Sequence, residues 1–309
     1  MGKSSAQGDL FSRRSIGGGG IGDGSDDRGA TLTVELYAWR PRLPLVNVPL
    51  LRRVRGRRRH NFGDELGPIV VRGVLDRLGL TEDAASGKHE RLVTVGSVLH
   101  FAKRGDHIWG SGINGKVARP LRVKGGELTI HAVRGPRTRR YLMDHGHDVP
   151  PIYGDPALLI SHVDKRFRLA GAEKQRQLLV VPNLNDMPRY RSHPQAISPL
   201  ADPLEIARLI SSSEFVVGSS LHAMVLADLF GVPCRPLMSA YENDFKYDDY
   251  YLGTGRELPE FARDVEHAIR LGGIDELVFR PEPILRAFPH ELFRAGGERT
   301  SEFTPVPIE

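Results

Sequence analysis

The chain has 309 residues, with 43 Lys and Arg against 38 Asp and Glu, a formal net charge of +5 and 40% hydrophobic residues. This length exceeds one ordinary hydrophobic core and suits two α/β domains of roughly 130 residues each. No hydrophobic run reaches the ~18–20 residues of a membrane-spanning helix. Cys234 is the only cysteine, which excludes a disulfide within the chain and argues against a cysteine-based zinc site.

The first 29 residues are expected to form a disordered arm. Their glycine-rich stretch at 17–24 has no strand before it and no helix after it, so it does not have the setting of a phosphate-binding loop. The arm also lacks the hydrophobic stretch of a signal peptide. With a single cysteine in the chain, these features favour a cytoplasmic location.

An arginine cluster follows the first expected strand, and it comprises Arg52, Arg53, Arg55, Arg57, Arg58 and Arg59. No aromatic residues are interleaved with these arginines, so nucleic acid is not expected as a partner. A solvated loop is the favoured interpretation. A surface for a phosphate-bearing substrate or for anionic lipid at the inner membrane face stays open as the alternative.

The first half of the ordered chain alternates strands with helices. Hydrophobic periodicity predicts strands at 31–39, 92–95, 107–109 and 128–133, helices at 64–79 and from 136 to about 145, and a short strand with a turn within 152–160. Pro68 lies inside the first helix and is tolerable because it is expected near the first turn.

A polar stretch at 164–176 is the expected linker, and a second α/β series follows it. The pattern predicts strands at 178–181 and 215–217 and helices at 203–211, 221–230, 260–271 and 283–293. The fold class is therefore α/β, with two doubly wound parallel-sheet (Rossmann-like) domains that face a cleft. The domains are expected at 30–163 and 177–295, with a frayed tail at 296–309. The last helix is assigned to the second domain, with packing back on the first as the alternative.

Residues 215–234 carry the strongest local signal. A hydrophobic strand leads into Gly218, and Ser219 and Ser220 then precede a helix that begins near Leu221. Backbone N–H groups and the helix dipole meet at such a junction and favour an anion, which His222 in the first turn could reach. The structural alternative is an ordinary crossover with capping serines and a packed histidine.

Further candidate residues follow the other expected strands, where parallel sheets place ligands. They are Asn61, Gly63, Asp64, Ser97, Ser111, Arg134 and Arg137. Each has a structural alternative: a helix cap for Asn61 or Asp64, a chain reversal at the serines, and an ion pair for an arginine. The segment 154–157 is interpreted as an Asx turn. The aromatic and acidic segment 241–251 is expected to be a loop that either stacks on a sugar or lies on the surface.

The order of five short motifs resembles the polysaccharide pyruvyltransferase family. They are Asn-Phe-Gly-Asp at 61–64, Gly-Ser-Gly at 110–112, Val-Arg-Gly-Pro-Arg at 133–137, Tyr-Gly-Asp-Pro-Ala at 153–157 and Gly-Ser-Ser-Leu-His-Ala at 218–223. The resemblance implies a fold similar to that of B-type glycosyltransferases. It also implies that the carbons of phosphoenolpyruvate are moved onto two hydroxyls of a saccharide as a ketal, with release of phosphate and with no metal or other cofactor.

Under this chemistry each candidate residue has an expected role. The donor is held by Arg134, Arg137, Ser219, Ser220 and the Leu221 N–H. His222 either moves a proton or binds phosphate, and Asp64 orients or deprotonates the acceptor. The acceptor side is formed by Asn61, Gly63, Ser97 and Ser111.

One position departs from the family pattern. Some relatives carry an arginine directly before the Leu-His pair, where this chain has Ser220. Either Lys246 or Arg137 supplies the missing charge, or the donor differs. The alternatives are therefore a nucleotide-sugar glycosyltransferase of the same fold and a non-catalytic anion- or glycan-binding protein. The favoured partners are phosphoenolpyruvate and a saccharide of a cell-surface polysaccharide, either free or linked to a lipid phosphate, with peripheral contact to the inner membrane face left open.

Overall fold

A computed structural model describes residues 32–40, 42–44, 55–58, 60–115 and 121–296, with only the backbone path given for 42–44 and 55–58. The expected arm, the side chains of the arginine cluster and the residues from 297 onward lie outside this description. Part of the cluster forms β3 (Arg55–Arg58), whose backbone pairs antiparallel with β2 (Arg42–Pro44). Residues from Thr31 onward belong to one compact unit, so the expected division at 164–176 stays a prediction.

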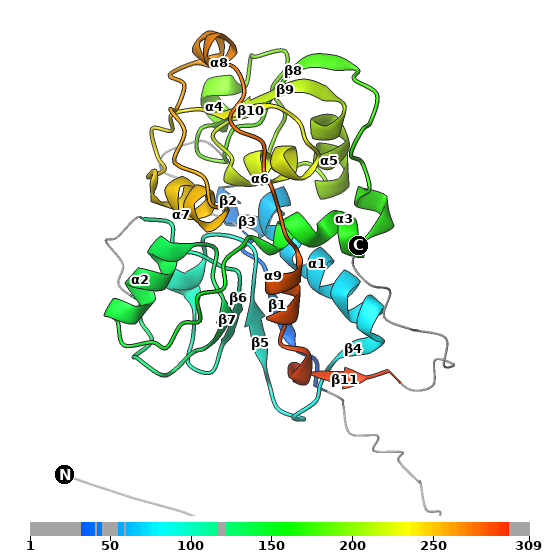
Figure 1. Ribbon diagram of the computed structural model, residues 1–309, viewed down its shortest axis with the longest axis vertical. Helices are drawn as coiled ribbons and strands as arrows, with labels where there is room; N and C mark the ends of the chain where they lie inside the picture. Colours follow the sequence, from blue (N-terminus) through cyan, green and yellow to red (C-terminus); the bar gives the residue numbers. More distant parts are fainter. Residues whose placement is uncertain (1–31, 41, 45–54, 59, 116–120, 297–309) are drawn as a thin grey trace, which may run out of the picture. The chain divides into compact units, whose positions relative to one another are not determined.

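The first sheet is parallel and contains β1 (Glu35–Tyr37), β5 (Arg91–Val93), β6 (His107–Trp109) and β7 (Thr129–Ala132), in that order (Figure 1). A bridge between Thr33 and Asp83 adds the antiparallel β4 (Leu80–Ala84) on the far side of β1. The chain therefore leaves β1 for β4 on one side of this strand and then continues into β5 on its other side. Such a reversal is the topological switch point of a doubly wound sheet.

The second sheet repeats this arrangement with β8 (Arg176–Val180), β9 (Ser213–Gly218) and β10 (Cys234–Pro236), all parallel. Val180 forms a bridge with Ala196 on the side of β8 that faces away from β9. The switch point of this sheet therefore lies between β8 and β9. These two sheets confirm the predicted α/β class with parallel sheets, whereas the two-domain arrangement of B-type glycosyltransferases stays a prediction.

Helix α1 (Phe62–Leu78) begins two residues earlier than the sequence indicated and ends at Gly79, whose φ of 66° is the left-handed conformation that glycine adopts readily. Pro68 consequently lies in the second turn, where it removes one backbone hydrogen bond, and its expected place near the first turn was wrong. The helix contacts α3 (Ile160–Val163), at the end of the expected first domain, and α5 (Pro203–Ser211), in the expected second domain (Figure 1). The N-terminus of α1 is held to the second half of the chain, because the Phe62 N–H donates to the Pro199 carbonyl at 3.0 Å.

The remaining helices and the last strand are distributed over both halves of the chain. They are α2 (Pro136–Asp144), η2 (Leu99–Phe101), η3 (Pro156–Leu159), η4 (Lys165–Phe167), α4 (Met187–Tyr190), α6 (Leu221–Leu229), α7 (Phe245–Gly253), α8 (Val265–Leu271), α9 (Glu282–Arg286), η5 (His290–Leu292) and β11 (Phe293–Ala295). Helix α8 starts at an Asp264 cap, five residues after its predicted start. The last predicted helix is shorter than expected because Pro289 follows α9, and β11 then pairs antiparallel with β4.

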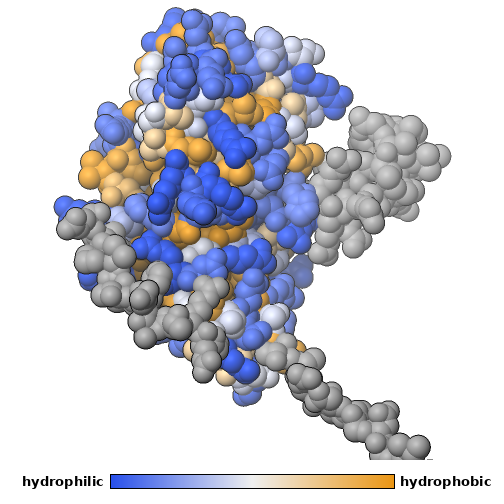
Figure 2. Space-filling view, turned by 90° about the vertical axis from the view of Figure 1, so that its right-hand side faces the viewer, coloured by the Kyte–Doolittle hydropathy of each residue, from blue (hydrophilic) through white to orange (hydrophobic). Residues whose placement is uncertain are grey.

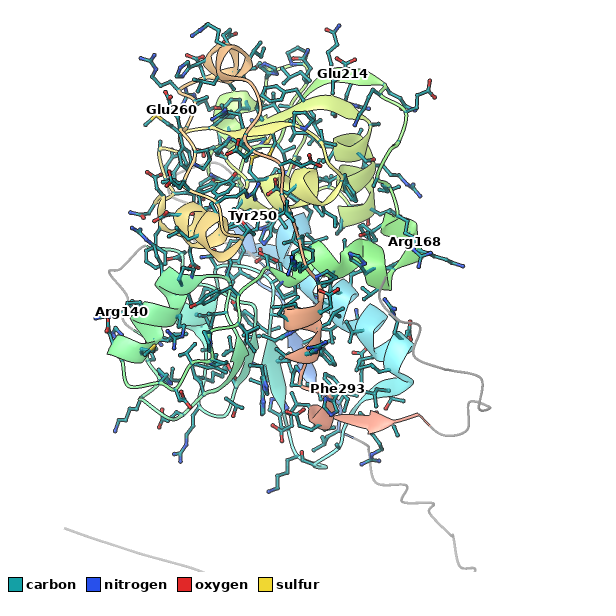
Figure 3. The ribbon with its side chains drawn as sticks, in the orientation of Figure 1. Arg140, Arg168, Glu214, Tyr250, Glu260 and Phe293 are labelled. Atoms are coloured by element: carbon teal, nitrogen blue, oxygen red, sulfur yellow. The ribbon has the colours of Figure 1, made fainter. Side chains whose placement is uncertain are left out.

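Residues 245–253 form a helix, so the prediction of a loop throughout 241–251 was wrong. Tyr247, Tyr250 and Tyr251 have the i, i+3, i+4 spacing of one helical face, and all three are buried in the largest core cluster. The Tyr250 hydroxyl donates to Asp228 on α6, and Arg256 forms an ion pair with the same carboxylate. In Figure 3, Tyr250 lies inside the fold, whereas Arg140, Arg168 and Glu214 lie at its edge. Helix α7 is thus anchored to α6.

Hydrophobic residues of the described part gather in three buried clusters, and the largest joins α1, α5 and α6. The face in Figure 2 is mostly hydrophilic, with hydrophobic patches between the polar residues. In the part of the chain that is described, no helix is both long and apolar enough to cross a membrane.

Candidate functional site

A pocket of about 520 Å³ opens where both sheets end. It is lined by Trp39, Asn61, Asp64, Ser97, Val98, His100, Phe101, Asn114, Asn183, Leu184, Asn185, Pro199, Ser220, Leu221, His222, Glu242 and Lys246. Seven of the predicted site residues are therefore brought together: Asn61, Asp64, Ser97, Ser220, Leu221, His222 and Lys246.

The pocket lies at the two switch points. Trp39 and Ser97 follow β1 and β5, the strands at which the first sheet reverses. Asn183 and Ser220 follow β8 and β9, the corresponding strands of the second sheet. A doubly wound sheet binds its ligand in this position because loops diverge there to opposite faces and leave a crevice.

The N-terminus of α6 forms one wall of the pocket. Ser220 occupies the N-cap position, and the N–H groups of Leu221 and His222 have no acceptor among the described residues. Lys246 of α7 lines the same pocket and forms an ion pair with Glu242 at 3.2 Å. Two backbone donors, a helix dipole and an ammonium group thus share this wall, which suits a small anion.

Ser219 lies outside the pocket lining, and its contact with a donor stays a prediction. It is buried, its hydroxyl accepts from the Asn183 N–H at 3.1 Å, and its carbonyl accepts from the Tyr247 hydroxyl at 2.7 Å. These contacts fix the turn before α6 to the loop after β8 and to α7.

His222 is largely buried, and its ring packs against the backbone of α1. A β-carbon at position 63 would overlap its Nδ1, so Gly63 is the residue that makes room for the ring. Burial, together with the positive charges of Lys246 and Arg134, lowers the pKa of His222 to about 3. The imidazole is therefore neutral near pH 7.

Asp64 lies near the start of α1 and accepts a hydrogen bond from the Asn61 side-chain amide at 2.6 Å. Asn61 stands at the N-cap position, but its side chain makes no capping bond. Burial raises the pKa of Asp64 to about 7, against the opposing effect of the Asn61 hydrogen bond. A carboxyl group with this pKa can take up or release a proton near neutral pH.

Arg134 does not reach the pocket wall. Its fully buried guanidinium forms an ion pair with Asp249 at 3.0 Å and donates to the Ser97 hydroxyl and to the Ile113 carbonyl. Gly112 allows this approach, because a β-carbon there would overlap the guanidinium. Arg134 thus holds the Ser97 hydroxyl by a hydrogen bond from outside the pocket lining. Its direct contact with a donor stays a prediction.

Three other predicted residues also lie outside the pocket lining. Arg137 is half-exposed and pairs with Asp248 on α7. Ser111 is buried and donates to the Gly96 carbonyl at 3.0 Å, which holds the turn before Ser97. Gly63 packs against the Nδ1 edge of the His222 ring. The structure places all three next to pocket residues, and direct ligand contact by them stays a prediction.

Several pocket residues were not predicted from the sequence: Trp39, His100, Phe101, Asn114, Asn183, Asn185 and Glu242. Trp39 is the last residue of one predicted strand and Asn183 follows another by two residues, so the rule that strand ends hold ligands could have identified them. Asp155 was also missed as a site residue, because the expected Asx turn accounted for it. Its Oδ1 does accept from the Ala157 N–H at 3.0 Å, and its other oxygen faces His222.

The fold and the pocket define an α/β protein with a pocket at the switch points of two parallel sheets. The sequence matches the family model of the polysaccharide pyruvyl transferases over residues 83–241, about half of the chain, and the chain belongs to this family. It is accordingly a transferase. The match includes Ser97, Asp155 and the junction at 218–223, while Asp64 and Lys246 lie outside it.

A solved structure, an uncharacterized protein from Klebsiella pneumoniae, is similar over 62% of this chain and 84% of its own, with 13% identity and a TM-score of 0.40. This score is too low to establish a common fold. Comparison with curated proteins found no match. In the described ranges, no group of three or more His, Cys, Asp or Glu side chains could hold a metal ion.

Proposed function

We propose that this pyruvyl transferase uses phosphoenolpyruvate as its donor and forms a ketal on a saccharide during assembly of a cell-surface glycan. One observation carries the proposal. Leu221 and His222, whose N–H groups have no acceptor among the described residues, line the same pocket as Lys246 and as Asp64, whose carboxyl group titrates near neutral pH. The pocket therefore combines an anion site with proton-transfer groups.

The overall reaction conserves its protons. Two acceptor hydroxyls form two C–O bonds to the central carbon of phosphoenolpyruvate, and the C–O bond to phosphate breaks. One hydroxyl proton goes to the methylene carbon, which becomes a methyl group, and the other leaves with phosphate. The site must therefore remove protons from oxygen and deliver one to carbon.

The donor is a small anion with a phosphate and a carboxylate. The N–H groups of Leu221 and His222 and the Ser220 hydroxyl are suited to the phosphate, and Lys246 supplies a positive charge on the same wall. Lys246 thus takes the place of the arginine that some relatives carry directly before the Leu-His pair.

Asp64 and His222 are the proposed proton-transfer groups. Asp64, with its pKa near 7, accepts a proton from an acceptor hydroxyl. His222 is neutral near pH 7, and the negative charge of a bound donor raises its pKa, because an opposite charge favours the protonated ring. The protonated imidazole then delivers a proton to the methylene carbon.

The acceptor is proposed to lie against the loops of the first sheet. Trp39 and Phe101 offer flat hydrophobic rings, while Asn61, Ser97 and Asn114 offer hydrogen-bonding groups in the same lining. A saccharide presents both kinds of surface, with C–H groups on its ring faces and hydroxyls at its edges.

A thermal-shift experiment with phosphoenolpyruvate and a set of nucleotide sugars tests the donor. Phosphoenolpyruvate at 100 times its dissociation constant should stabilise the fold by about 2.7 kcal/mol, and nucleotide sugars should not. The matched variants are Lys246→Met, which should reduce the shift, and Lys174→Met, whose ammonium bonds to the Ser211 carbonyl outside the pocket lining and which should keep it. A shift with nucleotide sugars alone would replace this proposal by a glycosyltransferase.

A further inference from the structure

Asp155 is a fully buried carboxylate with one satisfied and one unsatisfied oxygen. Oδ1 caps η3 by accepting from the Ala157 N–H. Oδ2 is closed off from solvent and has no hydrogen-bond partner within the described structure. A buried carboxylate oxygen without a partner costs free energy, so its placement calls for a functional explanation.

The imidazole of His222 faces this oxygen. Nε2 of the imidazole is likewise buried with no partner among the described residues, and it lies 4.0 Å from Asp155 Oδ2. This distance is about 1 Å longer than a hydrogen bond. The other ring nitrogen, Nδ1, lies next to Gly63 but, unlike Nε2, is not closed off from solvent, and His222 lines the pocket. Asp155 Oδ2 and His222 Nε2 therefore face each other, and neither has a hydrogen-bond partner among the described residues.

We infer that Asp155 is the positioning residue of His222: it holds the proton on Nε2 and so leaves Nδ1 as the nitrogen that exchanges a proton with the substrate. This inference rests on the proposed function. The hydrogen bond made by one ring nitrogen decides which tautomer is present. An aspartate with this role both fixes the ring and stabilises its charged form when the reaction protonates it.

The charges around the ring are consistent with this role. Lys246 on α7 and Arg134 after β7 both lower the pKa of His222. Asp155 is the carboxylate that faces the ring, and its own pKa is raised to about 6 by burial, against opposing effects of the Ala157 N–H and Arg134. Asp64 on α1 interacts with Asp155 and Lys246. Near pH 7.5 Asp155 is therefore mostly ionised and can accept from Nε2–H.

The decisive variant is Asp155→Asn. The asparagine carbonyl can still accept from the Ala157 N–H, so the η3 cap is kept, and the amide NH₂ group then faces Nε2. Because that amide donates, Nε2 must accept and the proton must move to Nδ1. The control is Asp164→Asn, at a second Asx cap where Oδ1 accepts from the Arg166 N–H and which does not line the pocket.

Nitrogen-15 NMR of histidine-labelled protein at pH 7.5 reads the tautomer directly, with the His222 signals identified by their loss in His222→Gln. We expect Nε2–H in the wild type and in Asp164→Asn, and Nδ1–H in Asp155→Asn. With phosphoenolpyruvate and an acceptor, kcat of Asp155→Asn should fall by between about 10-fold and the 10⁴-fold known for the aspartate of a Ser-His-Asp triad, with KM for the donor within a few-fold.

The two proposals fail in different ways. An Nδ1–H tautomer in the wild type, or the same tautomer in wild type and Asp155→Asn, overturns the positioning role whatever the donor is. The wild-type spectrum decides this even if Asp155→Asn does not fold. An inverted tautomer with an unchanged kcat also overturns it. Correct tautomers in a wild type that does not turn over phosphoenolpyruvate overturn the donor assignment and leave the His222–Asp155 pair in place.

Discussion

Gly63 and His222 approach each other so closely that a β-carbon at position 63 would occupy the place of the ring nitrogen Nδ1. Gly63 lies in the first turn of helix α1 in the first half of the chain, and His222 lies in the first turn of α6 in the second half. The position of the histidine ring is therefore fixed by a glycine about 160 residues away in sequence.

Gly63→Ala should displace His222 and lower kcat by at least about 10-fold, because a group misplaced by 1 Å can cost about 10² in rate. The matched control is Gly73→Ala in the same helix. A β-carbon at this position would lie 2.8 Å from the Val163 side chain, and neither Gly73 nor Val163 lines the pocket. Both variants should lose thermal stability, but only Gly63→Ala should lose most of its turnover. Equal activity in the two variants would contradict the close contact.

His222→Asn should bind phosphoenolpyruvate within a few-fold of the wild type and lose about 10²–10⁴-fold in turnover, because asparagine cannot exchange a proton near neutral pH. Calorimetric titration measures the binding and a coupled phosphate assay measures the turnover. A collapse of binding would instead make His222 a phosphate ligand. Unchanged values for both would show that the ring only packs the helix junction.

Lys246→Met should weaken phosphoenolpyruvate binding by about 2–5 kcal/mol, the usual cost of removing one partner of a desolvated charge pair. It should also raise the pKa of His222, because Lys246 lowers it. Calorimetry and histidine NMR measure the two effects, and Lys174→Met serves as the lysine control. If binding and the His222 pKa both stay unchanged, Lys246 is not the donor-side cation.

Arg134→Ala should destabilise the fold by about 3–5 kcal/mol, because it leaves the buried carboxylate of Asp249 without its ionic partner. Arg140→Ala is the control, since Arg140 forms an exposed pair with Asp144 on α2 that is worth at most about 1 kcal/mol. Urea unfolding without ligand gives both values. A stable Arg134→Ala that fails only in donor binding would restore the direct donor contact predicted from the sequence.

Asp64→Asn should stabilise the fold at high pH. Burial raises the folded-state pKa of Asp64 from 3.8 to about 7, so the folded protein holds this proton more tightly than the unfolded chain does. Its contribution is fully present below about pH 4 and is lost as the pH rises through 7. The Tm of Asp64→Asn minus that of the wild type should therefore grow between pH 4 and pH 8 by at least about 2–4 °C. A constant difference across this range would mean that Asp64 is not shifted.

The sequence by itself determined the elements that repeat a simple pattern. Helix α5 occupies the predicted residues 203–211, with Asp202 as its cap, and β9 and α6 follow the predicted strand–turn–helix order. Local hydrophobic spacing and capping decide these elements within a few residues, so no distant contact is needed to predict them. The motif order also identified the family that the sequence match establishes.

The tertiary structure decided which of those residues share a pocket and what each of them contacts. Arg134 and Ser219 have the composition of anion ligands, yet partners distant in the chain, Asp249 and Tyr247, bind them into the structure. Asp155 satisfies a local turn with one oxygen and faces His222 with the other only because η3 packs against α6. Sequence pattern reports the preferences of the nearest few residues, whereas burial, ion pairing and pKa depend on groups that meet only when the chain has folded.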